Sequence, residues 1–434
     1  MADDRIPAPS SPDPPPEAPP PPRRKVYEPT LFPERRHRRV PRWLAVPALL
    51  LVCGGLLSWL WTSQHQIRFV PTAGQIVYAS DQGTPGTPHL WIARSDGTGA
   101  HPLTRGPAAA AAPAFAPGGS QIAFLSDRDS RQNQVFVMDA DGQNVAQVTR
   151  NAGAKSQPAW APGTPGLLGY MAGGALSVVH LSSSGAGDAD RLLPPPPQAP
   201  HAPGAEGGPE ETLAQQGTVT VPAFAWCPAK GAGLAAVEDT GSFQALAVLP
   251  TLSGGVRDVR QTPQGEVPLA AADTLSLGWS PDGSLLAVAM LGIKGLPGAA
   301  SGILLFGRDG SLVNGPPPVL VRSATIGPQN PVFSPDGTQI LYEAWSQPDL
   351  ASRKRLGLYL IPVGGSPQPR LVYRGDVSDA QWTPDGSAIL FLVARPGGGH
   401  DLCRIAPDGT GFTRLSDGHA DISGLAISPQ SAAR

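Results

Sequence analysis

Short apolar stretches separated by turn residues recur along most of the chain. The segment Phe333–Trp345, FSPDGTQILYEAW, is representative of this pattern. Pro335, Asp336 and Gly337 favour a tight turn, because they supply a fixed φ, a side-chain acceptor and a positive φ in that order. The stretch QILYEAW after the turn is apolar on both faces, which is typical of a strand inside a packed sheet. The segment therefore predicts a β-hairpin.

The same phrase is repeated, and its spacing indicates copies of one structural unit. An aromatic residue two positions before a proline recurs at Phe115, Trp160, Trp226, Trp279, Phe333 and Trp382, with Ile427 as a weaker seventh. The prolines that follow are 45 to 66 residues apart. Each unit contains four short apolar runs joined by Gly and Asp turns, which is the sequence pattern of a β-propeller blade.

The two ends of the repeat series complement each other. Three strand-like runs between residues 75 and 104 lack an opening strand, and ISGLAISP, Ile422–Pro429, is an opening strand without successors. Joined, they make one blade and close the ring, so that no sheet edge stays exposed. The sequence predicts an all-β, seven-bladed β-propeller over residues 73–434 that is closed by the C-terminal strand. Six or eight blades remain open, because the third and fourth units are weak.

One unit resembles a known family. The run SDRDSRQNQVFVMDADGQNVAQVTRNAGAKSQPAWAP, Ser126–Pro162, is similar to the propeller repeat of the TolB family. The resemblance implies a propeller fold whose relatives serve as partner-binding platforms, as lactone or carbohydrate enzymes, and as gates of peptidases. The sequence ahead of the repeats does not resemble the α/β domain that precedes the propeller in TolB itself.

An uncharged apolar segment precedes the repeats. Residues 43–61, WLAVPALLLVCGGLLSWLW, are long enough to cross a bilayer as a helix, and tryptophans stand near both ends. Five arginines lie just before this segment and one lies shortly after it. We therefore expect a single-pass cell-membrane protein with a cytoplasmic N-terminus and an extracytoplasmic propeller. A cleaved signal peptide and a buried core helix are the alternatives.

Three further segments are low in apolar content. Residues 1–42 hold 13 prolines and predict a disordered cytoplasmic tail, whose arginines would fix topology or touch anionic lipid. Binding of this tail to a proline-recognising partner is the alternative. Residues 62–72 are interpreted as a linker. Residues 182–218 are interpreted as a low-complexity loop insertion within the propeller, either a disordered decoration or a binding arm.

Composition and charge limit the partners. The sequence has 52 glycines and 52 prolines, which suits a ring dense in turns. Residues 43–434 hold 23 Lys and Arg against 28 Asp and Glu, so this part predicts no nucleic-acid binding. Cys53, Cys227 and Cys403 lie in different predicted elements, and no disulfide is expected.

The search for catalytic motifs gives no candidate, so the sequence predicts no catalytic, cofactor-binding or metal-binding residue and no cofactor. H-E-x-x-H, G-x-S-x-G and phosphate-binding loops do not occur. Asp127 and Asp129, like Asp139 and Asp141, resemble the start of a calcium loop but lack its further ligands, and are interpreted as turn residues. The aromatic residues before the prolines are interpreted as packing between blades rather than as a glycan platform.

We therefore hypothesise a membrane-anchored binding or scaffolding module. Its partner would be an envelope or membrane protein, or a small ligand, held on a loop face or at the mouth of the central channel. The alternative is an extracytoplasmic hydrolase of lactonase or glycosidase type, with acidic residues or calcium at the channel mouth. A third hypothesis is signalling, in which the proline-rich tail reports ligand binding.

Overall fold

The computed structural model describes most of the repeat region. The described residues are 74–129, 131–182, 185–193, 219–231, 233–239, 241, 244–249, 257–258, 272, 274–292, 301–311, 313, 319–323, 325–346, 354–364 and 368–429. The predicted tail 1–42, membrane helix 43–61 and linker 62–72 lie outside them, so these remain predictions. Within the described part of the chain, no helix has the length and apolar character that a membrane span needs.

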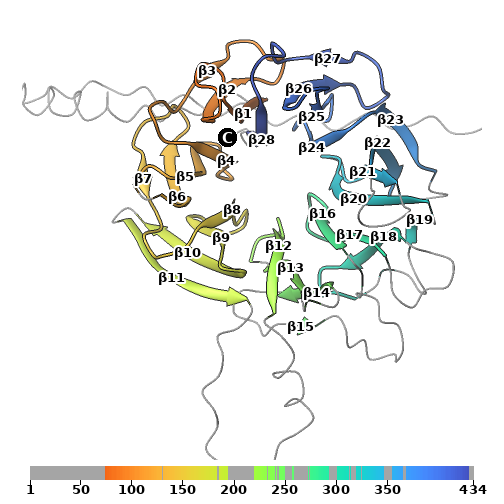
Figure 1. The fold of residues 1–434 in the computed structure, drawn as a ribbon. Coiled ribbons are helices and arrows are strands. Elements are labelled where there is room, and N and C mark those ends of the chain that lie inside the picture. Colours follow the sequence, from red (N-terminus) through yellow and green to blue (C-terminus); the bar gives the residue numbers. More distant parts are fainter. Residues whose placement is uncertain are drawn as a thin grey trace, which may run out of the picture. The chain divides into compact units, whose positions relative to one another are not determined.

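The described strands form seven antiparallel sheets of four strands, arranged as a ring (Figure 1). In blade 1 the order from the centre outward is β28 (Ile422–Ile427), β1 (Gln75–Ser80), β2 (His89–Arg94) and β3 (His101–Pro102). Blade 2 consists of β4 (Ala110–Phe115), β5 (Gln121–Ser126), β6 (Gln134–Asp139) and β7 (Ala146–Gln147). Blade 3 consists of β8 (Lys155–Trp160), β9 (Leu167–Ala172), β10 (Ala175–Ser182) and β11 (Gly185–Leu193).

The remaining blades follow the same order. Blade 4 consists of β12 (Thr220–Trp226), β13 (Leu234–Asp239), β14 (Gln244–Leu249) and β15 (Arg257–Asp258). Blade 5 consists of β16 (Thr274–Trp279), β17 (Leu285–Leu291), β18 (Ser301–Gly307) and β19 (Val319–Ser323). Blade 6 consists of β20 (Ile326–Phe333), β21 (Gln339–Ser346), β22 (Arg355–Pro362) and β23 (Arg370–Arg374). Blade 7 consists of β24 (Val377–Trp382), β25 (Ile389–Ala394), β26 (His400–Ile405) and β27 (Thr413–Arg414).

The C-terminal strand closes the ring, as the sequence predicts. Strand β28 pairs with β1 in the register Ile76–Ile427 and Val77–Ala426. The closure also involves Asp81, whose Oδ1 accepts a hydrogen bond from the backbone N–H of Asp421 at 2.7 Å. The seven blades and the pairing of β28 with β1 confirm the predicted all-β propeller.

Strand β11 differs from the expectation for residues 182–218. It occupies Gly185–Leu193 and pairs with β10, so the beginning of the predicted loop insertion is the outermost strand of blade 3. An outer strand needs only main-chain hydrogen bonds to one neighbour, so a segment poor in apolar residues can form it. Residues 194–218 lie outside the described residues.

The turn between the first two strands of a blade is built by the repeated Pro-Asp-Gly phrase. In blade 6 the Ser334 Oγ donates to Asp336 Oδ1 at 2.5 Å, and the backbone N–H of Thr338 donates to the same oxygen at 3.1 Å. These donors lower the pKa of Asp336. Gly337 has φ 73°, which a side chain disfavours. The sequence therefore fixes this turn through local hydrogen bonds alone.

The repeated tryptophan joins neighbouring blades. Trp226 of blade 4 is buried, and its Nε1–H donates to the backbone O of Ala159 in blade 3 at 2.9 Å. The indoles of Trp160, Trp279 and Trp382 make the corresponding bond to the preceding blade at 3.2, 3.1 and 3.4 Å. This confirms inter-blade packing as the role of the aromatic series and adds a hydrogen bond to it.

Replacing Trp226 with phenylalanine is expected to lower the free energy of unfolding by about 1 kcal/mol more than replacing Trp91, because only Trp226 loses an indole hydrogen bond. Chemical denaturation of the two variants measures this difference. Equal losses for Trp226→Phe and Trp91→Phe would contradict the assignment.

Candidate functional site

The innermost strands are bulged where they approach the centre of the ring. In β20 and β24 the pairing register shifts between Gln329 and Val332, and between Ser378 and Gln381. Each bulge contains a residue in the left-handed region, namely Asn330 with φ 50° and Asp379 with φ 53°. Both residues are exposed. Ala112 and Gln157 have the same backbone conformation in the bulges of β4 and β8, so the geometry belongs to the repeat, and the bulges of blades 6 and 7 differ in carrying Asn330 and Asp379.

Glu343 lies directly behind these two bulges. It is in the middle of β21 in blade 6, and its side chain faces blade 7, because Leu341 on the same face of the strand packs with Val377, Trp382 and other residues of blade 7. Only 1% of Glu343 is exposed. Neither carboxylate oxygen makes a hydrogen bond to the described residues. A buried carboxyl group without a partner is costly and rare, which makes this residue the strongest functional candidate.

Burial raises the pKa of Glu343 to about 7. The Asn330 side chain, the Arg355 guanidinium and the Asp379 backbone N–H oppose this rise, and the Asp379 carboxylate adds to it. Asn330 and Asp379 are close enough to act on the carboxyl, yet neither meets it in hydrogen-bond geometry. Near neutral pH the group can therefore gain or lose a proton when a ligand approaches.

The neighbouring polar groups are also incompletely paired. Trp345 is two residues beyond Glu343 on the same face of β21, and its buried Nε1 has no partner among the described residues. The Arg355 guanidinium lies over the Trp345 ring at 4.9 Å and its Nη1 is 3.3 Å from Asp376 Oδ1, while its Nε is unpaired. We call Glu343, Trp345, Arg355, Asn330 and Asp379 the blade 6–7 cluster. It offers two carboxyl groups and unused donors within one small region.

Of the acids singled out in the sequence, Asp139 and Asp141 serve the turn after β6, whereas Asp127 holds the end of β5 to the segment before β4. Asp127 Oδ1 accepts from the backbone N–H of Ala109, and Asp141 Oδ1 accepts from that of Gln143, both at 2.9 Å. Asp139 Oδ2 accepts from the Asn144 side chain at 2.7 Å. Within the described ranges no three His, Cys, Asp or Glu residues are placed to hold a metal ion. Cys227 and Cys403 are buried free thiols.

Sequence reasoning missed Glu343, Asn330 and Asp379. One signal was available, since Glu343 is the only acid in QILYEAW, a stretch that is otherwise apolar on both faces. An acid at such a position is either paired or functional.

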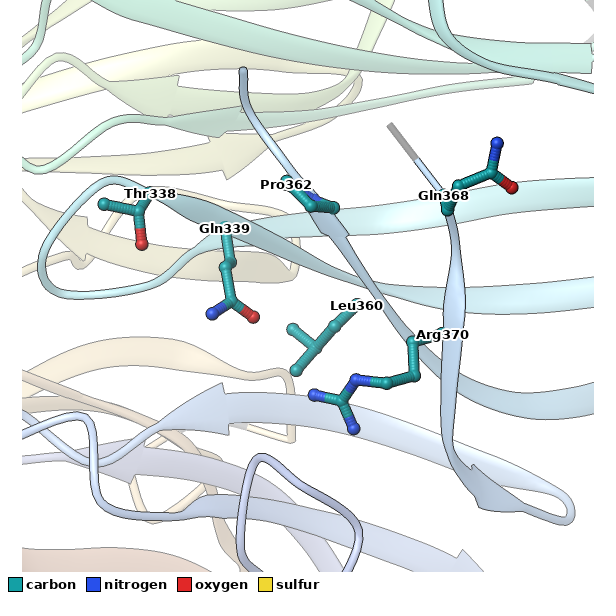
Figure 2. A pocket seen from close by; sticks show the side chains of 6 residues that line it. All are labelled: Thr338, Gln339, Leu360, Pro362, Gln368 and Arg370. Atoms are coloured by element: carbon teal, nitrogen blue, oxygen red, sulfur yellow. The ribbon is translucent and has the colours of Figure 1, made fainter. Parts of the chain in front are cut away.

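A shallow pocket of about 410 Å³ lies farther out on blade 6 (Figure 2). Its lining residues are Thr338, Gln339, Leu360, Pro362, Gln368 and Arg370. Its charged group is already used, because Arg370 Nη2 donates to the backbone O of Pro407 at 2.7 Å. The pocket therefore offers less binding chemistry than the blade 6–7 cluster.

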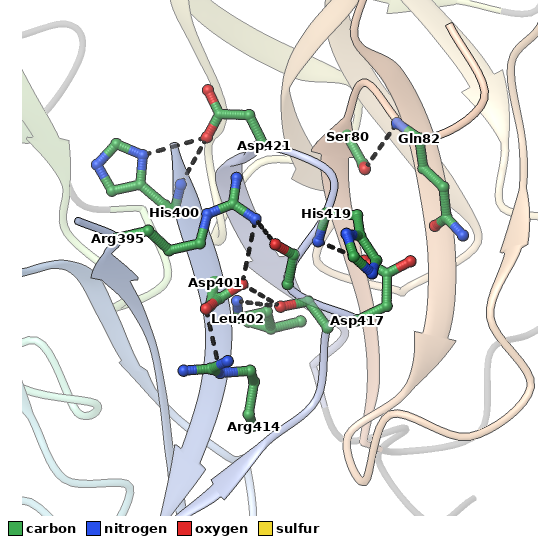
Figure 3. A network of polar contacts seen from close by, with 12 residues as sticks. Ser80, Gln82, Arg395, His400, Asp401, Leu402, Arg414, Asp417, His419 and Asp421 are labelled. Carbon is green, nitrogen blue, oxygen red and sulfur yellow. Dashed lines mark hydrogen bonds and ion pairs between the residues drawn. The ribbon is translucent and has the colours of Figure 1, made fainter. Parts of the chain in front are cut away.

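A dense polar network lies in blade 7 near the ring closure (Figure 3). Asp401 is buried and its carboxylate is 3.1 Å from Arg414 Nε and 3.6 Å from Arg395 Nη1. The Ser416 hydroxyl also donates to it at 3.0 Å. Because its charge is fully compensated, Asp401 is a structural residue that holds β26 to the segment after β27.

The fold defines the class of the protein: it is a seven-bladed β-propeller. The sequence matches no protein-family model and no curated protein. Among solved structures it is similar to a puromycin hydrolase, with a TM-score of 0.51 and 14% identity over 75% of this chain and 50% of that one.

The similar structures also include TolB propellers. TolB from Acinetobacter baumannii has a TM-score of 0.46 and 14% identity, over 82% of this chain and 67% of that one. A putative TolB from Agrobacterium tumefaciens has a TM-score of 0.42 and 15% identity, over 66% of this chain and 94% of that one. At these identities the likeness concerns the fold alone.

Proposed function

We propose that this protein is a binding module that holds its partner at the centre of the ring, over the blade 6–7 cluster. The observation that carries this proposal is the buried, unpaired carboxyl group of Glu343 behind the exposed bulges at Asn330 and Asp379. Such a group is stabilised when a ligand supplies the missing donors. The exposed Asp379 favours a partner that presents a basic or hydrogen-bond-donating group.

The cellular setting of the module is part of the same proposal. Residues 43–61 anchor the chain in the cell membrane, the arginine-rich tail 1–42 stays in the cytoplasm and contacts lipid, and the propeller lies outside. An envelope or membrane protein, or a small ligand, then reaches the cluster from the extracytoplasmic side. The apolar segment and the charge difference between its flanks support this arrangement.

Replacing Asp379 with asparagine is expected to reduce partner recovery about tenfold, because the change removes the charge but suits the left-handed conformation. The measurement is chemical crosslinking in the native membrane, followed by purification of the tagged full-length protein and mass spectrometry. The matched control is Asp141→Asn, which removes a charge from an exposed turn of blade 2. A partner that is lost equally from both variants, or from neither, would refute a site at the blade 6–7 cluster.

One observation favours hydrolysis as a second candidate function. A carboxyl group with a pKa of about 7 next to a second carboxyl group is the arrangement used in general acid–base catalysis. In that case Glu343 moves the proton, and Asp379 stabilises positive charge or orients water. Turnover of lactone or glycoside substrates that disappears in Glu343→Gln would establish this function, and its persistence in that variant would exclude Glu343 from catalysis.

A further inference from the structure

A residue at the start of the third strand has a fixed structural role in two blades, and it is recognised by the next residue, whose backbone N–H donates to a Ser or Thr hydroxyl oxygen. In blade 2 this residue is Gln134, whose Oε1 accepts from the Thr149 hydroxyl at 2.7 Å. The Thr149 oxygen in turn accepts from the backbone N–H of Val135 at 2.9 Å. The Gln134 amide donates to the backbone O of Gly153 at 3.1 Å. The side chain thus fills the space between the third strand and the segment that follows the fourth.

Blade 7 fills the same place with a carboxylate. Asp401 is the corresponding residue, because the backbone N–H of the next residue, Leu402, donates to the Ser416 hydroxyl oxygen at 3.2 Å. The Ser416 hydroxyl donates to Asp401, and two arginines surround the carboxylate (Figure 3). This blade therefore carries its own oxyanion.

Blade 1 has the same frame, but a histidine replaces the side chain that supplies the oxygen acceptor in the other two blades. The backbone N–H of Leu90 donates to Thr104 Oγ1 at 2.9 Å, which places His89 at the position of Gln134 and Asp401. His89 is 5% exposed, and its Nδ1 has no partner among the described residues. In the other two blades the equivalent hydroxyl donates to a side-chain oxygen, whereas the Thr104 hydroxyl donates to none of the described residues. His89 and Thr104 line a pocket of about 250 Å³.

Two more unused donors line this pocket. The buried Trp91 Nε1–H has no acceptor among the described residues, and indole nitrogen can only donate. The Arg105 guanidinium is also a pure donor, and it makes no ion pair with the residues that the structure describes. Asp81, which precedes the lining residues Gln82 and Gly83, is already engaged, since its two oxygens accept from the backbone N–H groups of Gly86 and Asp421 at 3.0 and 2.7 Å.

We propose that the blade 1 pocket binds a small oxyanion, a carboxylate or phosphate group, that takes the place Asp401 occupies in blade 7. Thr104, Trp91 and Arg105 donate hydrogen bonds to it, and the His89 ring lies against it. Arg105 supplies the charge, and the buried Thr104 hydroxyl and the buried Nε1–H of the half-buried Trp91 supply the geometry. This site is separate from the blade 6–7 cluster and does not depend on the function proposed there.

The test follows the indole N–H signals of the full-length protein, labelled with ¹⁵N-tryptophan, in detergent micelles. The protein is titrated with inorganic phosphate and, separately, with acetate. The chemical shift of the Trp91 indole N–H is expected to change until the site is saturated, and the anion that binds with the higher affinity identifies the anion class. The Trp91 signal is assigned by its loss in Trp91→Phe. The Trp160 signal, whose N–H is bonded to Ala114 O, serves as the internal control and stays in place.

Two variants make the result specific. Arg105→Gln is expected to weaken the affinity about tenfold through loss of a charge-assisted bond. His89→Asp places a carboxylate in the pocket, as in blade 7, and is expected to abolish the shift. The proposal is overturned if neither anion moves the Trp91 signal, if sodium chloride moves it as far at equal ionic strength, or if both variants bind like the native protein.

Discussion

Between pH 4.5 and pH 7 the free energy of unfolding of the native protein is expected to fall by about 3 kcal/mol, and the Glu343→Gln variant is expected not to show this fall. The folded-state pKa of Glu343, about 7, lies above the ordinary value of 4.5. Between these values the folded state keeps the proton and the unfolded state releases it, so the free energy of unfolding falls as the pH rises. Above pH 7 the folded protein contains a buried carboxylate, and the loss is complete.

Denaturant unfolding followed by tryptophan fluorescence at a series of pH values measures this effect. Asp408→Asn is the control of opposite sign, because the Thr410 side chain and backbone hold the pKa of the exposed Asp408 below its usual 3.8. The stability that Asp408 contributes is present above pH 3.8 and is lost as the pH falls. The Asp408→Asn variant therefore alters the pH dependence of the free energy of unfolding only at acidic pH. A Glu343→Gln variant that keeps the native slope between pH 4.5 and pH 7 would contradict the assignment of the buried carboxyl.

Replacing Gly278 with alanine is expected to destabilise the propeller by about 3 kcal/mol, at the upper end of the usual cost of overpacking. Gly278 is in β16, the innermost strand of blade 5, where it packs against the bulge of blade 6. A Cβ atom added there would be 1.9 Å from the backbone O of Pro331. Neither atom can move away without shifting an innermost strand, so the contact between blades 5 and 6 must open.

Gly118→Ala is the matched control, because a Cβ atom at Gly118 meets no other atom within 4 Å. Thermal unfolding of both variants compares the two positions directly. If Gly278→Ala unfolds at the same temperature as Gly118→Ala, the claim that blade 5 packs tightly on the blade 6 bulge is contradicted.

The fold could be predicted from the sequence because its determinants are local and repeated. Pro335, Asp336 and Gly337 form their turn through hydrogen bonds within a few residues, and the same phrase recurs in other blades. The closing strand was predictable because an unpaired opening strand at Ile422–Pro429 complements the incomplete first unit. The role of the tryptophans followed from their spacing, although their hydrogen bonds to the preceding blade did not.

The candidate site could not be predicted because it depends on contacts between repeats. Asn330, Glu343 and Asp379 come from three strands of two blades, and no local pattern brings them together. The bulges that expose Asn330 and Asp379 depend on left-handed backbone geometry, which Asn and Asp permit but do not require. The blade 1 pocket likewise appears only when His89 is compared with Gln134 and Asp401 in the folded blades.

The central claim is that a partner binds over the blade 6–7 cluster, and site-specific photocrosslinking in the native membrane tests it most directly. A photoreactive residue is placed at Ser378, next to Asp379, and in a second protein at Val145, which is 40% exposed on blade 2. We predict a discrete crosslinked product at Ser378 that is absent at Val145 and falls about tenfold when Asp379→Asn is added. A product that forms equally at both positions, or whose yield does not change when Asp379→Asn is added, would contradict the claim.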